Sequence, residues 1–194
     1  MIYKAIKGQT SYGEAIGIIL MESYMPFPPG CPGNATTFSF PVRYEVVRGA
    51  NMDRLVYRGD AKLIEPFVEA GWKLVNEGVK AITGNCGFMV LFQEYLANEF
   101  PVPVFMSSLL QIPFMSRMLK KGEKIGIVTA SAKTLTPKHL EIATGGIDVP
   151  MEIVGLEDKT YFHSAIHAEE GELDFEKVEA EVVEAALERT ARDD

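Results

Sequence analysis

The chain has 194 residues, of which 47% are hydrophobic, and its formal net charge is −8. This length allows one sizeable core or two small α/β lobes, and the hydrophobic content argues against disorder. The negative charge disfavours a nucleic-acid partner, and no apolar run approaches the roughly 20 residues of a membrane span. Two cysteines, Cys31 and Cys86, are too few for a disulfide framework. We therefore expect a globular protein of the reducing cytoplasm, where a reactive thiol stays available.

The first strand and the loop after it have clear signals in the sequence. Residues 15–21 form a nearly continuous apolar run, typical of a strand buried on both faces of a parallel sheet. Residues 26–34 contain four prolines and two glycines, which predicts a loop of constrained shape. Residues 37–47 alternate loosely between apolar and polar and indicate a short strand.

Helices and strands alternate from there to the middle of the chain. Asp60 is the expected N-cap of a helix that runs to about Glu77 and stops at Gly78. The apolar stripe that this helix is expected to bury comprises Leu63, Ile64, Phe67, Val68, Gly71, Trp72 and Val75. The pattern then predicts a strand at 79–83, a helix at 88–98, a strand at 102–106, and a helix from Ser107 or Ser108 to Lys120.

The second half continues the same alternation. Residues 125–129 predict a strand, and Thr136 followed by Pro137 opens a helix in the favoured order of cap and proline. Residues 151–156 predict another strand, and Asp174 is the expected cap of a long helix over residues 175–191. Strands that alternate with helices predict an α/β fold with parallel sheets.

One short segment occurs twice. Residues 13–19, GEAIGII, return at 122–128 as GEKIGIV, so five of seven positions match at an offset of 109 residues. The repeat predicts two similar α/β domains, at residues 1–117 and 118–194. If the domains correspond throughout, the counterpart of Cys86 in the second domain falls at position 195. We therefore expect the second domain to be incomplete.

Cys86 is the candidate functional residue. It lies between the strand predicted at 79–83 and the helix predicted at 88–98. Ligands of open α/β sheets bind at the carboxyl ends of strands, and a helix N-terminus lowers the pKa of a thiol. The neighbouring residues supply polar donors and close backbone approach: Thr83, Gly84, Asn85 and Gly87. The plainer alternative is a buried cysteine in a strand-to-helix turn, but we favour a functional thiol with a depressed pKa.

Three segments resemble the aspartate/glutamate racemase superfamily, in the branch of aspartate/glutamate and hydantoin racemases. They are TGNCGF at 83–88, PGNATTF at 32–38 and FPVRY at 40–44. The resemblance implies two pseudo-symmetric α/β domains and an isomerase that works without a cofactor. In such an enzyme, two cysteines face each other across a cleft and exchange the α-proton of an amino-acid or hydantoin-like substrate.

The resemblance also implies roles for individual residues. Cys86 corresponds to one acid/base, and Thr83 and Asn85 to positions that bind the substrate carboxylate or stand beside the thiol. Asn34 corresponds to a polar group on the substrate side, after the first strand. The residues that end the repeated strand correspond to the opposite wall of the cleft: Thr129, Ala130 and Ser131.

The second cysteine motif of the superfamily has no match in this sequence. Cys31 lies in the proline-rich loop and is interpreted as a loop cysteine. We expect a C-terminal segment to be missing and the 194-residue form to racemise poorly. Two alternatives stay open: a one-cysteine decarboxylase or maleate-isomerase-like enzyme on the same fold, and a non-catalytic remnant that binds small carboxylates.

Cofactor and metal sites are not expected. No phosphate-binding loop or dinucleotide fingerprint is present. His163 and His167 have a spacing that suits a metal on a helix, but no third ligand supports such a site. Met21 and Met25 are interpreted as fillers of the core or of an interface. The expected partner is a small carboxylate or amino-acid-like substrate, and self-association into a homo-oligomer is left open.

Overall fold

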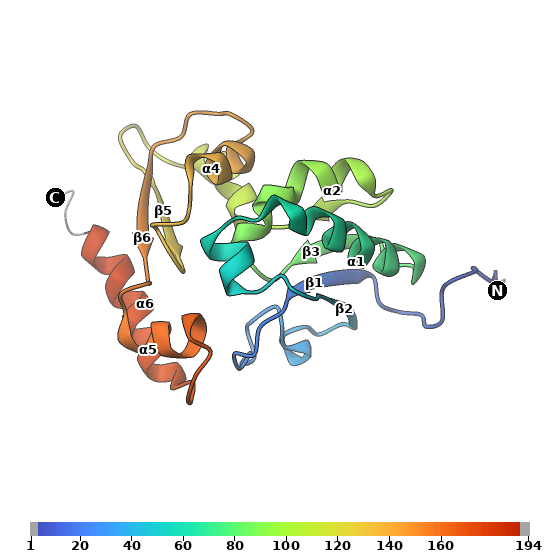
Figure 1. Cartoon of the computed structure of the whole chain (residues 1–194). Coiled ribbons are helices and arrows are strands. Elements are labelled where there is room, and N and C mark those ends of the chain that lie inside the picture. The colour runs from blue at the N-terminus through green and yellow to red at the C-terminus, as the bar shows by residue number, and fades with distance from the viewer. Residues whose placement is uncertain (1–3, 191–194) are drawn as a thin grey trace.

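The structure, a computed structural model, describes residues 4–190 and shows an α/β fold with two parallel sheets (Figure 1). The first sheet has the strand order β2-β1-β3-β4, and the second pairs β5 with β6. The strands are β1 (Ile16–Met21), β2 (Val42–Val47), β3 (Ala81–Gly84), β4 (Val104–Phe105), β5 (Ile125–Thr129) and β6 (Met151–Gly155). Every pairing within these sheets is parallel, which confirms the predicted fold class.

Helices connect the strands and cover the sheets. In Figure 1, α1 and α2 lie over the first sheet and α6 lies beside the second. The α-helices are α1 (Ile64–Asn76), α2 (Gln93–Glu99), α3 (Ile112–Ser116), α4 (Pro137–Thr144), α5 (Thr160–Phe162) and α6 (Phe175–Thr190). The shorter turns are 3-10 helices η1 (Ala35–Thr37), η3 (Ala61–Leu63), η4 (Gly87–Phe92) and η5 (Ser108–Gln111), and π-helices η2 (Met52–Tyr57) and η6 (His163–His167). None of the described helices is long and apolar enough to cross a membrane.

β1 is the central strand of the first sheet. It pairs with β2 on one side and β3 on the other, so that Ile18 lies opposite both Tyr44 and Thr83. The side chains of Ile18 and Ile19 are fully buried. The nearly continuous apolar run of this strand is what two covered faces require.

The predicted helix after Asp60 forms, with one correction to its buried face. The Asp60 carboxylate accepts a hydrogen bond from the Lys62 N–H at 3.0 Å and caps η3, which continues into α1. Leu63 and Phe67 are buried as expected, and Leu74, which the predicted stripe does not include, is buried as well. Trp72 is not, because it lies at the edge of the stripe, where its indole N–H donates to Glu99.

Other boundaries differ from the prediction. The helix expected to reach Lys120 ends as α3 at Ser116. Six short segments, η1 to η6, have 3-10 or π-helical geometry that the periodicity does not reveal. Asp174 caps α6 as predicted, by accepting a hydrogen bond from the Lys177 N–H. The last predicted residue of this helix, Ala191, lies outside the described residues.

The repeated segment keeps its local geometry. Gly13 and Gly122 have φ angles of 105° and 94°, a left-handed conformation that favours glycine. Each precedes its strand by the same number of residues, since β1 begins at Ile16 and β5 at Ile125. The two-domain division at residue 117 stays a prediction, and one hydrophobic cluster contains buried residues from both sheets.

Candidate functional site

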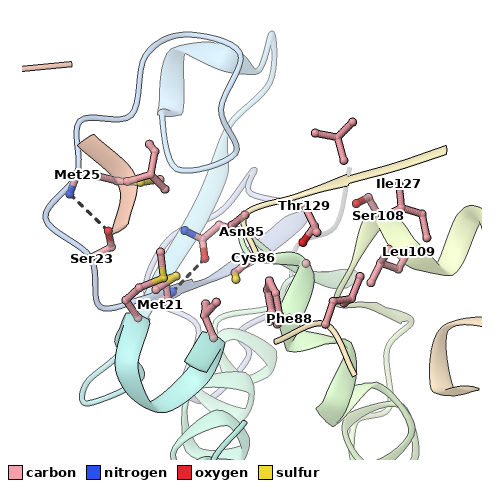
Figure 2. Close-up of a pocket in the computed structure, with 17 residues that line it drawn as sticks. Met21, Ser23, Met25, Asn85, Cys86, Phe88, Ser108, Leu109, Ile127 and Thr129 are labelled. Carbon is pink, nitrogen blue, oxygen red and sulfur yellow. Dashed lines mark hydrogen bonds between the residues drawn. The ribbon is translucent and has the colours of Figure 1, made fainter. Parts of the chain in front are cut away.

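A cavity of about 250 Å³ opens where the carboxyl ends of β1, β3 and β5 meet (Figure 2). This is the place where parallel sheets bind ligands. Walls also come from η2, from η5 and from η6. The lining residues are Met21, Ser23, Met25, Met52, Val56, Asn85, Cys86, Gly87, Phe88, Ser108, Leu109, Ile127, Val128, Thr129, Ala130, Leu135 and Ile166.

Cys86 occupies the middle of this cavity (Figure 2). It follows β3, has extended backbone angles and is the N-cap residue of η4. Burial raises the pKa of the Cys86 thiol to about 11, although the backbone N–H groups of Phe88 and Met89 act in the opposite direction. The expected depression of this pKa is therefore wrong. Desolvation of a thiolate among apolar walls outweighs what a short 3-10 turn contributes.

Three neutral side chains offer hydrogen bonds inside the cavity. The Oδ1 atom of Asn85 accepts a hydrogen bond from the Met21 N–H at 3.0 Å, which leaves its amide nitrogen as the donor for a ligand. Thr129 ends β5, and Ser108 begins η5. Their hydroxyl groups lie on the same side of Cys86 in Figure 2.

The cavity has no charged lining. None of the 17 residues drawn in Figure 2 is Asp, Glu, Lys, Arg or His. A ligand that carries a net charge would lose its hydration here without a charged partner in direct contact. Within the described residues, the cavity therefore suits a ligand of zero net charge.

The structure brings together five residues of the sequence-predicted site: Asn85, Cys86, Gly87, Thr129 and Ala130. The first three follow β3 of the first sheet, and the last two lie at the end of β5 of the second sheet. Cys86 and the end of the repeated strand thus line one cavity, and their expected roles on opposite walls of a substrate cleft stay a prediction.

Four predicted site residues lie outside the lining. Asn34 caps η1 and donates to the Phe27 carbonyl at 2.7 Å. The Thr83 hydroxyl donates to the Phe105 carbonyl at 2.6 Å, which joins β3 to β4. Gly84 permits close packing, because a Cβ atom there would lie 2.5 Å from the Met89 sulfur. Ser131 is buried and accepts a hydrogen bond from the Thr134 N–H. These contacts indicate that the four residues have structural roles.

The sequence interpretation missed the methionines of the cavity. Met21 and Met25 were expected to fill the core or an interface, but both line the cavity, as does Met52. Their place in the sequence could have indicated this role, because residues at or directly after the end of the first strand of a parallel sheet lie at its ligand-binding edge. Ser23 belongs to the same segment.

His167 joins elements that are distant in the sequence. Its Nδ1 accepts a hydrogen bond from the Tyr57 hydroxyl at 2.6 Å, and its Nε2 donates to the Ala130 carbonyl at 2.9 Å. His163 stacks on the same ring, with centroids 5.4 Å apart. The described residues contain no group of three or more His, Cys, Asp or Glu side chains arranged to hold a metal ion. The contacts that the structure describes for this pair are the ring stacking and the two hydrogen bonds of His167.

Curated proteins similar to this chain are named dimethylsulfoniopropionate lyases. The chain is 30% identical over 166 residues to dimethylsulfoniopropionate lyase 3 of Emiliania huxleyi (strain CCMP1516), covering 82% of this chain and 43% of that protein. It is 29% identical over 182 residues to the dimethylsulfoniopropionate lyase of Durusdinium sp. clade D, covering 89% and 58%. The chain spans about half the length of the curated relatives it matches. No family model matches it.

Solved structures with a similar chain path include racemases and a decarboxylase. Picrophilus torridus aspartate racemase matches with a TM-score of 0.48 at 15% identity, over 91% of this chain and 75% of that one. A glycine-to-cysteine mutant of arylmalonate decarboxylase, in its sulfate-associated form, matches with a TM-score of 0.48 at 14% identity, over 89% and 74%. These values describe a likeness of fold and carry no information on substrate.

The expected racemase function is corrected by the curated relatives. Their names describe cleavage of dimethylsulfoniopropionate, so the assignments to amino-acid racemisation, to the isomerase class and to amino-acid metabolism are wrong. The lining gives a physical reason. Aspartate and glutamate carry a second carboxylate, and no lysine or arginine lines the cavity to receive it.

Proposed function

We propose that this chain carries the catalytic thiol of a lyase that cleaves dimethylsulfoniopropionate or a closely related sulfonium carboxylate. The observation that carries this proposal is the uncharged cavity around Cys86. A sulfonium carboxylate is a zwitterion with no net charge, so it matches this lining better than a dicarboxylate does. The similarity to lyases over most of the chain supports the same substrate class.

The reaction is an elimination with a balanced course. A Cys86 thiolate takes the proton from the carbon next to the carboxylate, and the electrons of that C–H bond form the new double bond. The bond from the next carbon to sulfur breaks, and its electron pair leaves with sulfur as dimethyl sulfide. The other product is acrylate, and one proton returns to solvent when Cys86 ionises again.

The substrate helps to ionise the thiol. Burial raises the pKa of the Cys86 thiol to about 11, so the thiol by itself is neutral near pH 7. A sulfonium group bound within a few ångströms is an opposite charge in a poorly solvated site, and it favours the thiolate. Ionisation is thereby linked to the presence of the group that has to leave.

Neutral donors hold the carboxylate and the charge that develops on it. Removal of the α-proton places negative charge on the carboxylate oxygens, and fixed donors stabilise that charge more than they stabilise the substrate. The hydroxyl groups of Ser108 and Thr129 and the amide nitrogen of Asn85 lie in the cavity beside Cys86 (Figure 2). We assign them this role.

The two cysteines provide a matched test. We expect dimethyl sulfide release from dimethylsulfoniopropionate, measured by gas chromatography, to be abolished in Cys86→Ser and unchanged in Cys31→Ser. Cys31 is partly buried, and it lies outside the cavity lining. Equal activity of Cys86→Ser and the parent chain would remove the thiol from the mechanism. Absence of dimethyl sulfide with the parent chain, together with turnover of a dicarboxylic amino acid, would overturn the proposed substrate class.

A further inference from the structure

The cavity has two chemically different ends. In Figure 2, Met21, Ser23 and Met25 lie on one side of Cys86, and Ser108 and Thr129 lie on the other. The first side carries the thioether groups of Met21 and Met25, and Met52 also lines the cavity. The second side has two hydroxyl groups that can donate to an anion. A ligand with two unlike ends therefore meets two unlike environments.

The carboxylate of Glu169 lies next to Ser23, at the end of the cavity that Met21 and Met25 line, which we call the methionine end. The hydroxyl of Ser23, which lines the cavity, donates a hydrogen bond to the Glu169 Oε1 atom at 2.5 Å. Among residues 4–187, whose side chains the structure describes, Glu169 takes part in no salt bridge. Glu22, the neighbour of Ser23 in sequence, is different, because its carboxylate is paired with Arg48 at 3.0 Å. The Glu169 carboxylate therefore lies one side chain away from the cavity and has no salt-bridge partner among these residues.

The backbone holds Glu169 in an unusual conformation. Its φ angle is 54°, the only positive φ of a non-glycine residue among those described. A non-glycine side chain in this region is strained, and such residues persist where surrounding contacts fix them. The Ser23 hydrogen bond is one such contact.

We propose that Glu169 determines specificity for the cationic end of the ligand. This inference rests on the proposed function and adds the basis of substrate selection. The methylated cation lies against Met21 and Met25, whose polarizable thioethers suit methyl groups that carry positive charge. Glu169 attracts that charge through Ser23 without touching the ligand, and it acts as a positioning residue. The carboxylate then lies toward Ser108 and Thr129, and the α-carbon lies over Cys86.

One consequence is that the site recognises the methyl groups and the positive charge of the ligand and not its sulfur atom. The trimethylammonium analogue of the substrate carries one methyl group more than the sulfonium, and it has the same methylated positive end and the same net charge of zero. It should bind at this site, although an amine leaves less readily than a sulfide. The matched control ligand is its carbon isostere, in which a quaternary carbon replaces the nitrogen, so that shape is kept and the positive charge is removed.

The experiment measures binding of both ligands by titration calorimetry and needs no turnover. The parent chain should bind the trimethylammonium ligand more tightly than the carbon isostere. Glu169→Gln keeps an oxygen that accepts the Ser23 hydrogen bond and removes only the charge. We expect this variant to bind the trimethylammonium ligand about tenfold more weakly, which corresponds to about 1.4 kcal/mol. Its affinity for the carbon isostere should be unchanged.

Two further variants separate charge from structure. Glu170→Gln removes the same charge from the adjacent exposed residue and should leave the preference intact. Glu169→Gly removes the carboxylate and relieves the positive φ, so the preference should be lost while stability is kept or raised. Equal weakening of both ligands in Glu169→Gln, retention of the preference, or absence of binding by the parent chain overturns the inference. A charge preference that depends on Glu169 in a chain that releases no dimethyl sulfide would refute the proposed reaction and leave this inference standing.

Discussion

The repeated segment forms a strand in each sheet, but the two strands are buried differently. In β1, Ile19 has no exposed surface, whereas Val128, its counterpart in β5, is 41% exposed. β1 lies between β2 and β3, and β5 pairs with β6 alone in the part of the chain that the structure describes. The comparison shows that the local sequence specifies a strand and its entry turn, while neighbours distant in sequence decide how many faces are covered.

The glycines of the repeat differ in the same way. A Cβ atom added at Gly17 would lie 2.9 Å from a methyl carbon of Leu74, because α1 packs closely on β1. At Gly126, the equivalent position, a Cβ atom would meet nothing within 4 Å. One glycine is thus required by packing, and the other is not.

The largest expected effect comes from truncating the matched apolar pair. Ile19→Ala should lower the free energy of unfolding by about 2–5 kcal/mol, since it opens a cavity in a filled core. Val128→Ala should cost less than about 1 kcal/mol, because its side chain is largely in water. Urea unfolding monitored by circular dichroism measures both. Equal losses would show that the two strands are equally buried in solution.

The glycine pair should give a smaller difference. Gly17→Ala should cost about 1–3 kcal/mol, because Leu74 is buried and has to move. Gly126→Ala should be neutral or stabilising by a few tenths of a kcal/mol, since it restricts the unfolded chain without a clash. The same unfolding assay applies. A destabilised Gly126→Ala would indicate a partner on the exposed face of β5.

The hydrogen bonds of His167 connect Tyr57, in the region of the first sheet, with Ala130 at the end of β5, and they should contribute modestly to the free energy of unfolding. Tyr57→Phe removes the hydroxyl that donates to Nδ1 of a buried imidazole, and we expect a loss of about 1–2 kcal/mol. Tyr12→Phe is the matched control, because Tyr12 is well exposed and the change should be silent. A silent Tyr57→Phe would mean that this link adds nothing to the association of the two sheets.

The smallest effect is a dependence of stability on pH. Burial lowers the pKa values of His139 and His167 in the folded protein. As the pH falls below about 6.5, the unfolded chain therefore binds protons before the folded chain does, and stability decreases. Above about pH 6.5, the contribution of these two histidines to the free energy of unfolding is fully present. His167→Gln should show a shallower decrease between pH 7 and pH 5 than the parent chain. An identical slope would assign the pH dependence to other groups.

Part of the candidate site could be predicted because its residues are local to strand ends. The TGNCGF segment places Cys86 after β3, and the repeat places Thr129 and Ala130 at the end of β5. Thr83 and Asn34 belong to the same motifs but face other parts of the chain. A motif gives position along a strand, but which side chains reach the cavity depends on the pleat and on the neighbouring strand. Reaction class is less predictable still, since one fold supports several chemistries.

The sequence by itself determined the alternating parallel α/β fold, the strand and turn that recur at 122–128, and a cysteine at the carboxyl end of a strand. These features depend on residues within a few positions of one another. Only the tertiary structure decided the raised pKa of Cys86, the methionine end of the cavity and the carboxylate of Glu169 behind Ser23. Burial and electrostatic attraction act through space, and the residues that produce them here come from segments as far apart as Ser23 and Glu169.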